Sequence, residues 1–170
     1  MNYRMAVCAG LLILTIPSLA IAKKKDELSI TSQHVPGVTR LLEEQPLSPE
    51  APALRALMLQ WEDNSEDSID VVCGEVLGPI LVKGTPNGPQ LMAQFIFGSA
   101  ASQIVDPSQK DQIQPNQLAG MRSMLKAYAN FLAADAGNRV PYLDEWTAAE
   151  ASGELPAKLE PLAAKCATSV

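Results

Sequence analysis

Residues 115–137 read PNQLAGMRSMLKAYANFLAADAG. Apolar side chains recur here every three or four residues, which places them on one face of a helix: Leu118, Met121, Leu125, Tyr128 and Leu132. Pro115 suits a first helical turn, because the N–H that proline lacks would have no partner there. Ala136-Gly137-Asn138 is a typical helix end. The stretch therefore predicts the longest helix of the chain, with one apolar face to bury.

The same period extends to both sides of this helix. Segments with helical spacing cover residues 49–61, 69–80, 89–105, 141–152 and 156–166. A strand over residues 71–73 is the alternative in the second segment, but its alternation fails at Gly74-Glu75. We expect that helix to stop or kink at Gly78-Pro79. The pattern predicts an all-α fold: a compact bundle of five or six short helices, residues 49–170.

Residues 23–48 lack this period. They contain Lys23-Lys24-Lys25, Pro36-Gly37 and Pro46, with few large apolar residues. We expect a flexible or extended arm with at most a short helical turn over 40–44.

Residues 1–22 have the organisation of an export signal. Arg4 precedes an apolar run, and Ala20-Ile21-Ala22 offers small residues at the −3 and −1 positions of a signal peptidase site. Cleavage after Ala22 would send the protein to the periplasm. The alternative is an uncleaved membrane anchor, because the apolar stretch approaches the length of a spanning helix.

Two cysteines, Cys73 and Cys166, remain in the chain that starts at Lys23. An even number in an oxidising compartment favours a disulfide. It would join the helix over 69–80 to the last helix.

Composition excludes several classes of function. The chain of 170 residues is 47% hydrophobic and 19% charged, with 13 Lys and Arg against 19 Asp and Glu. Removing residues 1–22 takes away one base, Arg4, so the mature chain carries 12 bases and 19 acids, a net charge of −7. Such an acidic chain is a poor match for nucleic acid, and a single histidine excludes most zinc sites. We expect no cofactor, no metal and no catalytic residue.

One acidic run is the best candidate for a partner-docking surface. It consists of Glu62, Asp63, Glu66, Asp67 and Asp70. A calcium loop starting at Asp63 would have Ser68 at the position that needs glycine, and Gly74 at the position of the bidentate glutamate. A simpler explanation than a binding site is that these acids lie at a helix N-terminus, where the helix dipole favours them. Phe97 lies off the apolar stripes of its helix and would add to an interface if exposed.

Other residues support weaker hypotheses. Glu75, Asp144 and Glu145 could serve a carboxylate-dependent cell-wall hydrolase, although any acidic chain supplies such pairs. Aromatic side chains near Phe95, Phe97 and Trp146 could line the pocket of a small-molecule or lipid carrier. His34 lies in the expected arm, where nothing positions it as a general base.

In size, export signal and helical spacing the chain resembles immunity proteins that neutralise secreted amidases, without a shared motif. The resemblance implies a protein partner and assigns no site. We therefore expect a periplasmic, non-enzymatic protein-binding module of adaptor or immunity type, with carrier and hydrolase as alternatives. The partner's identity and the oligomeric state stay open.

Overall fold

The long helix expected from Pro115 forms α5, Ile113–Ala134, in the computed structural model, which describes residues 29–167. It runs antiparallel to α4, Gly88–Val105, since Gln94 pairs with Ser123 while Gly98 lies against Ala119. A Cβ atom at Gly98 would lie 2.3 Å from the Cβ of Ser123, so only glycine allows the two helices to approach this closely.

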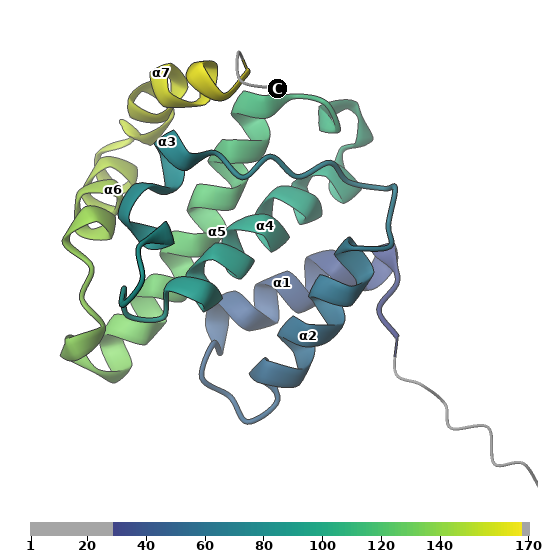
Figure 1. Cartoon of the computed structure of the whole chain (residues 1–170), viewed down its shortest axis with the longest axis horizontal. Helices are drawn as coiled ribbons and strands as arrows, with labels where there is room; N and C mark the ends of the chain where they lie inside the picture. Colours follow the sequence, from purple (N-terminus) through teal and green to yellow (C-terminus); the bar gives the residue numbers. More distant parts are fainter. Residues whose placement is uncertain (1–28, 168–170) are drawn as a thin grey trace, which may run out of the picture.

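The remaining elements cover this central pair on two sides (Figure 1). The fold is all-α, and residues 29–167 contain no strand. They hold seven α-helices, where five or six were expected, and four short 3-10 turns. Besides α4 and α5, the elements are η1 (Ser32–His34), α1 (Val35–Glu44), α2 (Ala51–Glu62), α3 (Gly74–Leu77), η2 (Gly78–Leu81), η3 (Pro107–Gln109), η4 (Ala136–Asn138), α6 (Pro141–Ser152) and α7 (Leu155–Ala167).

Helix α4 is buried on all sides. Leu91 and Phe95 pack into a core shared with α5, α6 and α7, whereas Ala93 and Phe97 pack into a second cluster with α1 and α2. Phe97 is fully buried, so its placement in a docking surface is wrong. Phe97 lies off the apolar stripe of α4 because this helix buries a second face against α1 and α2.

The expectation of a flexible or extended arm is wrong for residues 32–44, which form η1 and α1. Val35 and Leu42 of α1 are fully buried against α2 and α4. Residues 23–28, with the three lysines, lie outside the described residues, as do residues 1–22, where an export signal was predicted. The helical domain therefore begins before residue 49.

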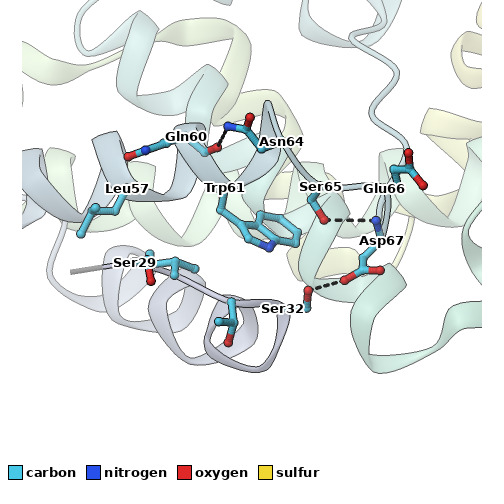
Figure 2. A pocket seen from close by; sticks show the side chains of 11 residues that line it. Ser29, Ser32, Leu57, Gln60, Trp61, Asn64, Ser65, Glu66 and Asp67 are labelled. Carbon is cyan, nitrogen blue, oxygen red and sulfur yellow. Dashed lines mark hydrogen bonds between the residues drawn. The ribbon is translucent and has the colours of Figure 1, made fainter. Parts of the chain in front are cut away.

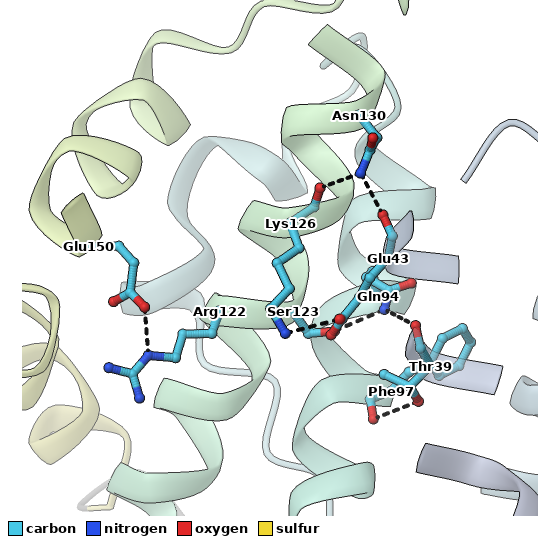
Figure 3. A network of polar contacts seen from close by, with 9 residues as sticks. All are labelled: Thr39, Glu43, Gln94, Phe97, Arg122, Ser123, Lys126, Asn130 and Glu150. Atoms are coloured by element: carbon cyan, nitrogen blue, oxygen red, sulfur yellow. Dashed lines mark hydrogen bonds and ion pairs between the residues drawn. The ribbon is translucent and has the colours of Figure 1, made fainter. Parts of the chain in front are cut away.

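A buried polar network attaches α1 to the central pair (Figure 3). Ser123 donates to Oε1 of Glu43 at 2.7 Å, and Lys126 forms a 3.0 Å ion pair with Oε2 of the same carboxylate. Gln94 donates both to the Ser123 hydroxyl and to the carbonyl of Thr39. The network fixes α1 by polar contacts as well as by its apolar face.

Residues 69–73 are not helical, which corrects the helix expected over 69–80; only Gly74–Leu77 forms α3. Residues 66–73, here called the strap, cross α4 and α5 to reach α3 (Figure 1). Cys73 ends the strap and forms the expected disulfide with Cys166 of α7. The disulfide thus joins the strap, and not a long helix, to the last helix.

The helices of residues 29–167 include none with the length and apolar character needed to cross a lipid bilayer.

Candidate protein-binding surface

The acidic run lies at the C-terminal end of a helix, which corrects its interpretation as a helix start. Glu62 is the last residue of α2 and Asp63 is its C-cap. No helix begins directly after them, because α3 starts at Gly74. The C-terminal end of a helix carries partial negative charge, so acids there are unfavourable for the helix. Helix stability therefore gives no reason for these acids.

Four of these residues form what we call the acidic border: Glu62, Asp63, Glu66 and Asp67. Asp63, Glu66 and Asp67 are exposed, whereas Glu62 is half-buried. The turn after α2 is held by its own side chains, since Asn64 donates to the Gln60 carbonyl at 2.6 Å. The border is thus a defined part of the structure whose charges face solvent.

A groove of about 580 Å³ runs beside the acidic border (Figure 2). Its walls are residues 29–32, the end of α2 with Leu57 and Trp61, and residues 64–67. Ser32 donates to the carboxylate of Asp67 and closes one end between the two segments. The half-buried Trp61 indole is the aromatic side chain among the residues that line the groove. The groove therefore combines an aromatic wall with a negative rim.

The strap continues this surface away from the groove. Ile69 is 45% exposed and Val72 is 49% exposed. The strap therefore presents apolar side chains directly beside the acidic border.

Asp70, the fifth acid of the run, does not belong to the exposed patch. Both of its carboxyl oxygens are buried, beside the Glu62 carboxyl and the Ser99 hydroxyl. Burial is the main cause that raises the pKa of Asp70 to about 8, and the neighbouring Glu62 carboxyl adds to it. Asp70 is therefore largely neutral at pH 7 and cannot attract a basic partner as a charge.

The three carboxylates considered for hydrolysis lie on separate elements or already have partners. Tyr128 and Arg139 contact Asp144 at 2.7 and 2.8 Å, and Glu145 lies 3.7 Å from Lys158. Glu75 is exposed on α3 and has no hydrogen bond or ion pair within residues 29–167. The structure brings no pair of them together around a cavity.

The aromatic residues expected to line a carrier pocket are core residues. Phe95 and Trp146 are each 1% exposed in one cluster, and Phe97 belongs to the other. His34 is exposed, and its Nδ1 accepts the N–H of Thr31 at 3.1 Å. Across residues 29–167, no group of three or more His, Cys, Asp or Glu side chains is placed to hold a metal ion.

Two glutamines that the sequence analysis did not single out hold the strap. Gln103 of α4 accepts the N–H of Ile69 at 2.9 Å and donates to the Ile69 carbonyl at 3.0 Å. Gln117 of α5 donates to the carbonyl of Val71 at 2.7 Å. The sequence could have pointed to these two glutamines, because each is a polar residue at a position where the helical spacing predicts burial.

Comparison with known proteins identifies no relative: no protein-family model matches the chain, and neither a curated protein nor a solved structure is significantly similar to it. The site must therefore be interpreted from its own chemistry.

Proposed function

We propose that this protein is an exported, non-enzymatic domain that binds a basic protein partner through the acidic border. The observation that supports the proposal most is the position of Glu62 and Asp63 at the C-terminal end of α2. Acids there oppose the helix dipole, so their presence favours a role in binding over a role in folding.

The neighbouring strap supports a protein as the partner. Charged side chains beside exposed apolar ones are the usual composition of an interface between proteins. Ile69 and Val72 supply the apolar part, and Glu66 and Asp67 supply charge at the same segment. Export to the periplasm is part of the proposal and rests on the signal-like residues 1–22 and on the Cys73–Cys166 pair.

The test is retention of a partner by the immobilised mature protein, residues 23–170, from the periplasmic fraction of the organism that makes it. We expect a small set of retained proteins with basic surfaces, eluted by raising the salt concentration, because exposed charges are screened by salt. Neutralising the exposed border should reduce retention at least tenfold: D63N, E66Q and D67N.

A matched control neutralises three exposed acids elsewhere and should leave retention unchanged: E50Q, E154Q and E160Q. Both triple variants change the net charge equally. A difference in partner retention between them is therefore caused by the position of the charges that were removed. Equal retention by the two variants would contradict the proposal. Co-purification of a lipid or small molecule with no retained protein would instead favour the carrier.

A further inference from the structure

Residues 68–72 of the strap are hydrogen-bonded along one backbone edge only, whereas the Glu66 carbonyl, at the start of the strap, accepts a bond from Lys110. Successive backbone groups of an extended segment point alternately to its two edges. Ile69 and Val71 point toward the bundle, where Gln103 and Gln117 bond them. Ser68, Asp70 and Val72 therefore direct their N–H and C=O groups to the opposite edge. No hydrogen bond within residues 29–167 reaches the backbone of these three residues.

Such an edge is a template for another strand. Unpaired backbone groups of an extended segment pair readily with a second extended chain, and proteins use this pairing to bind peptides. Gln103 contacts both the N–H and the carbonyl of Ile69, much as a neighbouring strand would. The side chain of Gln103 on α4 thus fixes both backbone groups of Ile69 before any partner arrives.

We propose that the strap binds an extended, basic segment of the partner protein as an added strand, with lysine or arginine side chains on the acidic border and aliphatic ones on the face of Ile69 and Val71. This inference rests on the proposed function and names the segment and chemistry of the contact. Charge complementarity selects this occupant. A second copy would bring the same acids against Glu66 and Asp67, and an anionic membrane would be repelled likewise.

A small cavity beside the strap adds a seat for one aliphatic side chain. It has a volume of about 180 Å³ and is lined by Ile69, Val71 and Ile113 together with the start of α5. This is below the roughly 300 Å³ of the smallest ordinary ligand pockets, so a side chain fits it better than a free metabolite. Asp111 and Lys110 also line the cavity, so its rim carries one charge of each sign and its own contribution to binding is apolar.

The probe is a seven-residue model peptide that alternates lysine with valine or leucine, blocked at both ends. Two control peptides replace lysine by glutamate, or methylate the backbone nitrogens on the pairing edge. We expect the first peptide to bind the mature protein at least tenfold more tightly than either control. Amide hydrogen exchange in residues 68–72 should slow on binding, whereas exchange at the exposed end of α6 should not change.

Two substitutions of exposed valines test the position. Val72→Lys places a positive charge on the strap and should weaken peptide binding at least tenfold. Val82→Lys changes a valine that is 61% exposed outside the strap and should alter binding less than twofold. Equal effects of the two substitutions would overturn the proposal.

The failures of the two proposals can be told apart. A partner that depends on the acidic border, but leaves the exchange of residues 68–72 unchanged, would overturn the added strand and keep the proposed function. If K23E, K24E and K25E together tighten peptide binding tenfold, the chain's own lysines compete for the strap, and the external partner segment is overturned. Failure of the lysine peptide to bind more tightly than its glutamate control would also overturn it.

Discussion

Two buried carboxyl groups, Glu43 in α1 and Asp70 in the strap, occupy similar surroundings but differ in their partners. Glu43 is 7% exposed, and both of its oxygens are bonded, one by Ser123 and one by Lys126. Both oxygens of Asp70 are buried, and the ionisable group that acts on them is another acid, Glu62. A buried carboxyl group with a basic partner can join elements, whereas one beside another acid keeps its proton.

The regions around the two carboxyl groups also differ in how firmly they are held. The α1 network links three helices through side chains that all have partners (Figure 3). The strap has no helical hydrogen bonds and is held by one disulfide and by the side chains of Gln103, Gln117, Lys110 and Ser32. Binding segments belong to the less stable parts of proteins, where local opening is easiest. The comparison therefore assigns folding to one region and binding to the other.

Removing the disulfide should have the largest effect on this comparison. In the variant Cys73→Ala with Cys166→Ala, the unfolded chain regains the freedom of a loop that spans 93 residues. We expect a loss of about 4 kcal/mol in the free energy of unfolding and a fall in melting temperature of about 10 °C. Thermal unfolding followed by circular dichroism measures both.

Hydrogen exchange locates the effect of the same variant. Amides of residues 69–73 should exchange faster, while those of the Glu43 network keep their protection. A variant that loses less than about 1 kcal/mol would show that the amides of Gln103 and Gln117 hold the strap without the covalent bond.

Glu43→Ala should cause the next largest loss of stability, because it removes the carboxylate at the centre of the polar network of α1. The Ser123 hydroxyl, in a residue that is 3% exposed, loses its acceptor. Lys126 is largely exposed and can turn to solvent, so we expect a loss of about 2 kcal/mol. Denaturant unfolding measures it.

Glu43→Gln and Glu44→Ala provide the controls. Glu43→Gln keeps an acceptor for Ser123 and loses only the ion pair, so about half of the loss should remain. Glu44→Ala changes an exposed neighbour and should alter stability by less than about 0.5 kcal/mol. Similar losses in all three variants would mean that the network does not secure α1.

The sequence predicted those parts of the fold that depend on local pattern. The apolar stripe of α5, the stops at Gly78 and Gly153 and the all-α class follow from spacing and turn residues. The disulfide followed from cysteine parity and the export signal. Helix α1 was missed because Pro36-Gly37 interrupts a short stripe that only its contacts with α2 and α4 make stable.

The strap could not be predicted, because long-range contacts decide it. Ile69, Val72, Cys73 and Val76 have helical spacing, yet Gln103 takes the backbone groups that a helix would have used. This is a tertiary contact across 34 residues. The acidic run was recognised as a candidate surface, but its place at the end of α2 depends on the same contact. A conflict between local pattern and structure is common at functional segments.

The pH dependence of stability tests the contrast between the two carboxyl groups directly. Because the pKa of Asp70 is raised from 3.8 to about 8, the folded protein holds a proton there that the unfolded chain loses above about pH 4. The free energy of unfolding should therefore fall as pH rises from about 5 to 8, by up to about 1.4 kcal/mol per pH unit from this group. Asp70→Asn keeps the shape and removes the titration, so the difference between variant and wild type should grow over that interval. A difference between D70N and wild type that stays constant from pH 5 to 8 in denaturant unfolding would contradict the neutral buried carboxyl, and with it the assignment of charge to the exposed acids alone.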